Sequence, residues 1–123
     1  PKEEGEMIES ELTKSLTPFA KVYPFKIPDT ETGTAISYRR IGNRVRTKYY
    51  SMNQQISEAL YFVVRQEPTY ISLCDDSNFI SSITKYKSEN LLSIRFDGYE
   101  DFETTNGQYE RQYRLIVLHK ETI

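Results

Sequence analysis

The chain has 123 residues, of which 37% are hydrophobic, 13% aromatic and 28% charged. A polypeptide of this length builds one domain with a single sizeable core, and its aromatic content excludes intrinsic disorder. The formal net charge of −2 gives no overall attraction to nucleic acid, so a site for a charged partner must be a local patch.

A single cysteine, Cys74, leaves the chain without an internal disulfide and favours a reducing compartment. No signal-peptide pattern opens the sequence, and no apolar run reaches the length of a membrane span. We therefore expect an intracellular protein of the cytoplasm or nucleus. Because the first residue is Pro1 rather than Met, we also expect a piece of a longer protein or a chain whose tag was removed.

Residues 1–17 predict an acidic amphipathic helix that forms one globular unit with an α+β domain over residues 18–123. Ile8, Leu12 and Leu16 recur at the spacing of one helix face, and a proline ends the helix. This apolar stripe either packs on the domain's own sheet or pairs with a second copy of the chain or another protein. The second alternative makes Ile8, Leu12 and Leu16 candidate oligomerisation residues.

Residues 19–27 predict an extended segment, which a polar loop over residues 28–33 connects to the next strand. Pro24 lies inside the segment and lacks a backbone N–H. A proline is tolerated in a sheet only at an edge or a bulge. We therefore expect this strand at the edge of the sheet or at a bulge.

Residues 35–50 form the most basic stretch of the chain, AISYRRIGNRVRTKYY. Gly42-Asn43 is typical of the two-residue turns that close β-hairpins, so two short strands are predicted here. Because side chains alternate between the faces of a strand, four cations share one face of this basic ribbon: Arg39, Arg44, Arg46 and Lys48. The other face holds Ile36, Tyr38, Val45, Thr47 and Tyr49, together with Arg40.

The basic ribbon has three interpretations. It binds an acidic surface on a partner protein or on another copy of the chain, it binds nucleic acid, or it is solvated or neutralised within the chain. Nucleic-acid binding would place cations on phosphates and stack Tyr38, Tyr49 and Tyr50 on unpaired bases. The candidate binding residues for either partner are Arg39, Arg44, Arg46, Lys48, Tyr38 and Tyr50.

Residues 51–67 predict a helix with Ser51 as its cap and Gln54 as the capping-box partner. Its buried stripe is expected to contain Met52, Ile56, Ala59, Leu60, Val63 and Val64. This is the central helix that we expect to pack on one face of the sheet.

A short strand is predicted over residues 69–74, followed by a short helix that Asp75 or Asp76 caps. The apolar side of this helix is expected to hold Phe79, Ile80, Ile83 and Tyr86. The final third of the chain predicts a long hairpin, roughly residues 91–102 and 108–120.

The final hairpin is expected to turn at Asn106-Gly107. This turn would place Ile94 opposite His119 and Phe96 opposite Val117. One face of the hairpin is then acidic and could neutralise the basic ribbon within the chain or attract it between copies: Asp97, Asp101, Glu103 and Glu110.

The sequence favours no catalytic, metal or cofactor site. A nucleophile-base pair would require Cys74 to meet His119, the chain's single histidine. No metal-ligand motif or glycine-rich phosphate loop is present. The acids Asp97, Glu100, Asp101 and Glu103 could serve acid-base chemistry, but Arg111 and Arg114 are expected next to them in the hairpin, where these acids are better explained as solvated or paired with the arginines.

Residues 40–45, RIGNRV, are similar to a short strand motif in the capsid proteins of small single-stranded DNA viruses. A helix is expected to follow here, where a capsid jelly roll would continue with strands, so we infer no function from this resemblance. We predict a single α+β domain with a mostly antiparallel sheet of about five to six strands. Its predicted role is a non-enzymatic interaction module of an intracellular multi-subunit assembly, with nucleic-acid binding as the alternative.

Overall fold

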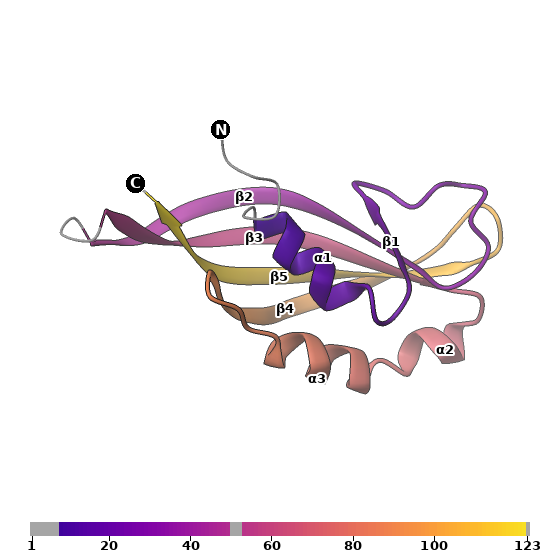
Figure 1. The fold of residues 1–123 in the computed structure, drawn as a ribbon. Coiled ribbons are helices and arrows are strands. Elements are labelled where there is room, and N and C mark those ends of the chain that lie inside the picture. The colour runs from indigo at the N-terminus through magenta and orange to yellow at the C-terminus, as the bar shows by residue number, and fades with distance from the viewer. Residues whose placement is uncertain (1–7, 50–52, 123) are drawn as a thin grey trace.

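A computed structural model describes residues 8–49 and 53–122 of the chain (Figure 1). The helices are α1 (Ile8–Leu16), α2 (Tyr70–Cys74) and α3 (Ser77–Lys85). The strands are β1 (Lys21–Pro24), β2 (Ala35–Tyr49), β3 (Gln54–Glu67), β4 (Leu91–Glu103) and β5 (Tyr109–Thr122). They form one sheet in the order β1-β2-β3-β5-β4, in which β1 runs parallel to β2 and every other pair is antiparallel. The predicted α+β class and mostly antiparallel sheet of about five to six strands are confirmed, with five strands among the described residues.

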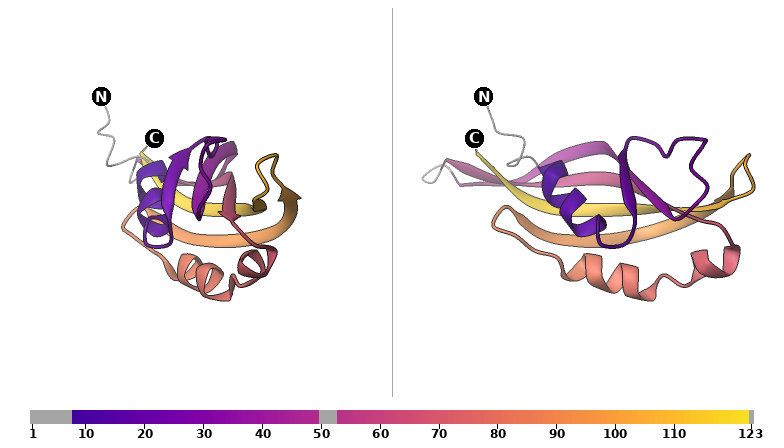
Figure 2. Two further views of the ribbon diagram at one scale, coloured as in Figure 1. Left: turned by 90° about the vertical axis from the view of Figure 1, so that its right-hand side faces the viewer. Right: turned by 45° about the vertical axis from the view of Figure 1, so that its right-hand side comes forward.

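The core lies between one face of the curved sheet and helices α1 and α3 (Figure 2). We call this the inner face. Alternate residues of β3 and β5 supply its centre, including Tyr61, Val63, Tyr113 and Leu115, which are all buried. Ile8, Leu12 and Leu16 of α1 and Phe79 and Ile83 of α3 complete the cluster. The amphipathic helix predicted at the N-terminus is confirmed from Ile8 onward, and its first seven positions lie outside the described residues.

The helix predicted over residues 51–67 is wrong, because this segment forms strand β3. Its apolar residues fit helical spacing, but they fit a two-residue period equally well once Tyr61 and Arg65 are counted as buried. Both side chains face the core and are satisfied by hydrogen bonds. Ser51 and Met52 lie outside the described residues. The central helix on the inner face is α3 instead.

The strand predicted over residues 69–74 is also wrong, because Tyr70–Cys74 forms the short helix α2. The Thr69 side chain caps it by accepting a hydrogen bond from the Ser72 N–H, a local interaction that the alternating hydrophobic pattern did not reveal. The next helix, α3, is confirmed and buries Phe79 and Ile83.

The hairpin turn predicted at Gly42-Asn43 is wrong, because β2 continues through both residues to Tyr49. The partner of β2 is β3, and two bulges interrupt their register, between Arg40 and Gly42 and between Val45 and Thr47. A bulge shifts the alternation of side chains by one residue. The faces on which Arg39, Arg44, Arg46 and Lys48 lie therefore cannot be assigned by counting alternate residues along β2.

The hairpin of β4 and β5 is confirmed, with a different register. Ile94 pairs with Val117 and Phe96 with Leu115. The loop is longer than two residues, since the Thr104 N–H donates to the Gln108 carbonyl. A bulge around Gly98, which has a φ of 96°, adds a further shift. Beyond this bulge the alternation changes and Asp101 turns to the inner face, opposite Arg111.

The first strand, β1, lies at the sheet edge, as Pro24 predicts. The structure departs from a viral jelly roll, because its described strands form one sheet rather than two packed sheets. Within the described ranges, no helix is both long and apolar enough to cross a membrane.

Candidate functional site

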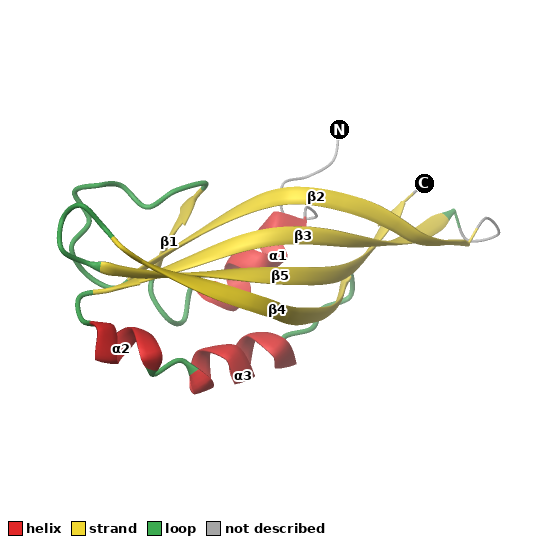
Figure 3. Cartoon of the chain, turned by 180° about the vertical axis from the view of Figure 1, so that it is seen from behind, coloured by secondary structure: helices red, strands yellow, loops and turns green. Residues whose placement is uncertain are grey.

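The face of the sheet turned away from α1 and α3, which we call the outer face, carries no helix among the described residues (Figure 3). Antiparallel sheets can leave one face to water, and such a face is normally polar. Here its centre is apolar, with half-buried Leu60 and Phe62 of β3 beside Ile116 and Leu118 of β5. This uncovered apolar strip is the first unusual feature of the outer face.

Cations surround the apolar strip. Arg39 and Arg114 stand in register on either side of Phe62, and Arg95 of β4 is in register with Ile116. We define the cationic half of the outer face as Arg39, Arg44, Arg46, Arg95, Arg114 and Lys120. Of the predicted binding residues, Arg39, Arg44 and Arg46 therefore belong to one surface. Its other members come from β4 and β5, outside the predicted ribbon.

Arg44 and Arg46 share one carboxylate. Arg44 Nη2 donates to Glu58 Oε1 at 2.7 Å, and Arg46 Nη1 donates to Glu58 Oε2 at 2.9 Å. The Glu58 side chain is 8% exposed, whereas those of Arg44 and Arg46 are 78% and 54% exposed. The hydrogen bond from Arg44 and the charge of Arg46 lower the pKa of Glu58. Two guanidinium groups over one carboxylate leave a net positive charge with its remaining donors facing solvent.

The other predicted binding residues do not join this surface. Tyr38 is half-buried and packs against the core on the inner face. The side chains of Lys48 and Tyr49 and all of Tyr50 lie outside the described residues. Arg40, predicted on the face opposite the four cations, does lie on the inner face, where its Nε is 2.8 Å from Glu9 Oε2.

The acidic face predicted for the final hairpin is divided by the bulge at Gly98. Of its predicted members, Glu110 lies on the outer face, whereas Asp101 turns inward and pairs with Arg111. Among the described residues, no ion pair joins Asp97, Asp101, Glu103 or Glu110 to the cationic half. The carboxylate that neutralises part of the ribbon is Glu58, on the strand next to it.

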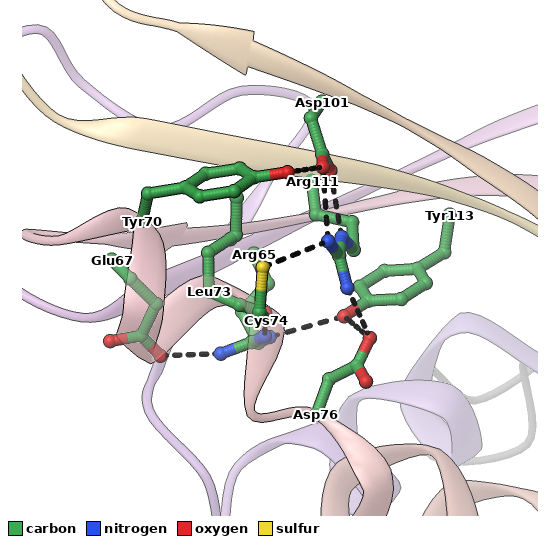
Figure 4. A network of polar contacts seen from close by, with 9 residues as sticks. All are labelled: Arg65, Glu67, Tyr70, Leu73, Cys74, Asp76, Asp101, Arg111 and Tyr113. Atoms are coloured by element: carbon green, nitrogen blue, oxygen red, sulfur yellow. Dashed lines mark hydrogen bonds and ion pairs between the residues drawn. The ribbon is translucent and has the colours of Figure 1, made fainter.

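A second arginine pair lies on the inner face, where Arg65 of β3 is directly opposite Arg111 of β5 (Figure 4). Arg111 donates from Nε and Nη2 to the two carboxylate oxygens of Asp101, at 2.7 and 2.9 Å, and from Nη1 to Asp76 at 2.9 Å. Its side chain is only 5% exposed. The Arg111 hydrogen bonds are the main cause of the lowered pKa of Asp101.

Arg65 is equally well satisfied. It donates to Glu67 at 2.6 Å, to the Tyr113 hydroxyl at 3.3 Å and to the Leu73 carbonyl. The Tyr113 hydroxyl in turn donates to Asp76 at 2.9 Å, and burial raises its pKa. These bonds fix α2 and the start of α3 to the sheet. Every charge in this cluster has a protein partner, so we assign it a structural role.

Ile8, Leu12 and Leu16 are buried in the chain's own core. This packing matches the alternative in which the stripe covers the domain's own sheet.

The two residues considered for catalysis, Cys74 and His119, lie far apart. The His119 Nε2 is 3.2 Å from Asn43 Oδ1, whereas the exposed Cys74 contacts Arg111. Arg111 and His119 are eight positions apart on β5, which is about 26 Å along a strand.

The described part of the chain holds no group of three or more His, Cys, Asp or Glu side chains placed to bind a metal. Sequence reasoning missed Leu60, Phe62 and Arg114 as surface residues, because the first two were assigned to a helix. Reading residues 54–67 with a two-residue period would have placed Glu58, Leu60 and Phe62 together on one face.

A scan of protein-family models and a search of curated proteins find no match to this sequence.

Proposed function

We propose that this chain is a non-enzymatic protein-interaction module of an intracellular multi-subunit assembly, and that its outer face binds an acidic surface on a partner protein. The observation that carries the proposal is the uncovered apolar strip surrounded by the cationic half. Apolar area supplies the driving force for association, and complementary charge selects the partner and orients it. An apolar centre with a charged rim is the usual composition of a protein interface.

The arrangement of Arg44 and Arg46 supports this proposal. Because Glu58 holds both side chains in place, less conformational entropy is lost when they bind an acidic partner. Guanidinium groups bind carboxylates with two parallel hydrogen bonds. The ribbon therefore presents oriented donors rather than freely moving charges.

Nucleic acid remains the rival partner, and the surroundings of Tyr38 and Phe62 argue against it. Single-strand binding needs aromatic rings with a free face for the bases. Tyr38 packs in the core, and the guanidinium of Arg39 lies 5.4 Å from the centre of the Phe62 ring. The apolar strip thus offers aliphatic area and a ring that already packs on a guanidinium, which suit an acidic protein better than a stack of bases.

The proposal is tested with a labelled peptide of about 20 residues that alternates glutamate with alanine and leucine. We expect this peptide to bind, and Arg95→Glu with Arg114→Glu to weaken binding at least tenfold, because neither arginine has an ion-pair partner among the described residues. Lys85→Glu with Lys87→Glu is the matched control, since both lysines are exposed and lie outside the outer face.

A labelled oligothymidylate of similar length is titrated in parallel at about 50 and 200 mM salt. Oligothymidylate binding with a steep salt dependence, together with no peptide binding, would replace the proposal with the nucleic-acid alternative. Equal loss of peptide binding in the control variant would show that only net charge matters, and the outer face would then not be the interface. Melting temperatures of both double variants should match that of the parent chain.

A further inference from the structure

Phe25, directly after β1, is held in an unusual backbone conformation. Its φ is 72°, and the Lys26 N–H donates to the Pro24 carbonyl at 2.8 Å, closing a three-residue turn around it. A positive φ is rare for a bulky side chain, and this form of γ-turn is strained. The ring is nevertheless 65% exposed. Such strain clusters at ligand-binding positions, and burial does not explain it here.

The exposed ring lies over Arg39. The guanidinium carbon of Arg39 is 5.3 Å from the centre of the Phe25 ring and 5.4 Å from that of Phe62. The Arg39 side chain is thus held by two aromatic rings, while no hydrogen bond or ion pair to it is found among the described residues. A guanidinium held through its faces keeps its N–H edge free for a carboxylate.

Arg39 also lines a cavity of about 400 Å³ on the outer face. Ser37, Val64 and Gln112 line it from the sheet, between the loop that follows β1 and the loop that joins β4 to β5. Asn106 ties these loops together, because its Nδ2 donates to the Asp29 carbonyl at 2.9 Å and to the Glu31 carbonyl at 3.2 Å. The volume is in the range of ligand-binding clefts.

Charges of both signs line the cavity, Lys26 and Arg39 as well as Asp29, Glu103 and Glu110. By register Arg39 lies at one end and Glu110 at the other, and Glu110 is close enough to Asp29 to be affected by its charge. Burial, followed by the charge of Asp29, raises the pKa of Glu110, and no ion pair to Glu110 is found among the described residues. A ligand with a cation at this end would supply the missing partner.

The spacing of the two ends fits an extended polypeptide. Arg39 is in register with Arg114, which lies two strands away, about 10 Å across the sheet, and four positions from Glu110, about 13 Å along β5. The Cα atoms of Arg39 and Glu110 are therefore about 16 Å apart. In an extended ligand, residues i and i+4 are about 13 Å apart and point to the same side, and the length of their side chains covers the remaining few ångströms. The charges of a free amino acid are too close together to reach both ends.

We propose that this cavity binds an extended segment of the partner protein that carries an acidic side chain for Arg39 and, four residues away, a basic side chain for Glu110. This inference rests on the proposed function and specifies what part of the outer face recognises. Phe25 forms the wall that holds Arg39 in position, and the polar floor of Ser37 and Gln112 accommodates the backbone between the two charged side chains.

The test uses blocked peptides of about nine residues, built from serine and alanine with one glutamate and one lysine. The charged pair stands at positions i and i+4, in both orders. The control peptide has it at i and i+3, because these residues of an extended chain point to opposite sides. Binding is followed by NMR of the full chain, at the Gln112 side-chain amide, with peptide up to about 1 mM. We expect one order with spacing four to bind at least fivefold more tightly than spacing three.

Three variants identify the contacts. Arg39→Gln should remove the preference for glutamate over glutamine in the peptide, and Glu110→Gln should remove the preference for lysine over norleucine. Phe25→Gly should weaken binding without destabilising the chain, because glycine adopts a positive φ at no steric cost. Lys85→Gln, at an exposed lysine of α3 outside the outer face, is the control and should bind normally.

Equal binding of both spacings, or no shift of Gln112 with any peptide, would overturn this inference. If the alternating acidic peptide still binds and still depends on Arg95 and Arg114, the cavity proposal fails while the proposed function stands. If neither kind of peptide binds, both fail.

Discussion

Two arginine pairs lie on opposite faces of the same sheet, and they differ in what surrounds them. Arg65 and Arg111 on the inner face are buried, and three carboxylates, a hydroxyl and a carbonyl satisfy them. Arg44 and Arg46 on the outer face share one carboxylate and remain mostly exposed. The same residue type therefore closes the fold on one face and leaves charge available for binding on the other.

The difference follows from desolvation. A buried guanidinium must have a protein partner for its charge, since an uncompensated charge in the interior is costly. An exposed guanidinium is solvated, so its ion pair contributes little to stability. Only the exposed pair can exchange water for a partner's carboxylates without breaking the fold.

The largest effect is expected from Arg111→Ala. This change leaves Asp101 and Asp76 without their buried partner, which should lower the free energy of unfolding by about 3–5 kcal/mol. Urea unfolding measures it. Arg95→Ala is the control and should stay within about 0.5 kcal/mol of the parent chain. A loss below about 1 kcal/mol for Arg111→Ala would show that the inner pair is not a structural cluster.

A smaller effect is expected from Tyr113→Phe. The hydroxyl accepts from Arg65 and donates to Asp76, so its removal leaves one buried donor and one buried acceptor with fewer partners. The expected cost is about 1–3 kcal/mol, again measured by urea unfolding. Tyr99→Phe changes an exposed ring and should be close to neutral.

The sequence predicted much of the fold, and its errors have definite causes. The α+β class, the edge position of Pro24 and the final hairpin could be recognised from local patterns. Strand β3 could not, because Tyr61 and Arg65 are polar residues that are buried only through tertiary hydrogen bonds. Without them the remaining apolar residues follow a helical period as well as a strand period.

The candidate site was predicted in part. Arg39, Arg44 and Arg46 do share the outer face, although the hairpin that suggested this is wrong. The contributions of Phe62 and Arg114 depend on the neighbours of β2 in the sheet, and the long-range order of strands is not encoded in a local pattern. The bulge at Gly98, which turns Asp101 toward the inner face, could not be located from the sequence either.

Acid should affect both arginine pairs. The folded-state pKa values of Asp101 and Glu58 are lowered, so each carboxylate contributes stability above its unfolded pKa of about 4. That contribution is lost as the pH falls through the folded-state pKa, because the unfolded chain then binds more protons. We expect Asp101→Asn to flatten the decline in stability between about pH 4 and 2.

Glu58→Gln gives the matching measurement for the outer pair. Glu58→Gln should also flatten the decline in stability between about pH 4 and 2. This flattening should be smaller in about 1 M salt, because exposed arginines are screened, whereas the flattening by Asp101→Asn should persist in salt. Equal salt sensitivity of the two variants would contradict the distinction between the buried pair and the exposed pair.

The smallest effect on stability is expected from Arg44→Ala or Arg46→Ala alone. In each variant the other arginine still pairs with Glu58, so the urea midpoint should hardly move. The double variant leaves the Glu58 carboxylate unpaired and should cost more than the sum of the two single changes. Additive effects would show that the two arginines do not share Glu58 in solution.

The central claim, that the outer face binds an acidic partner, is tested most directly by methyl NMR of the chain titrated with the alternating acidic peptide. The methyl groups of Leu60, Ile116 and Leu118 report on the outer face, and those of Val63, Leu115 and Val117 report on the inner face. We predict that the three outer residues shift with one common dissociation constant while the three inner residues stay in place. Shifts confined to the inner residues, or equal on both faces, would contradict the account.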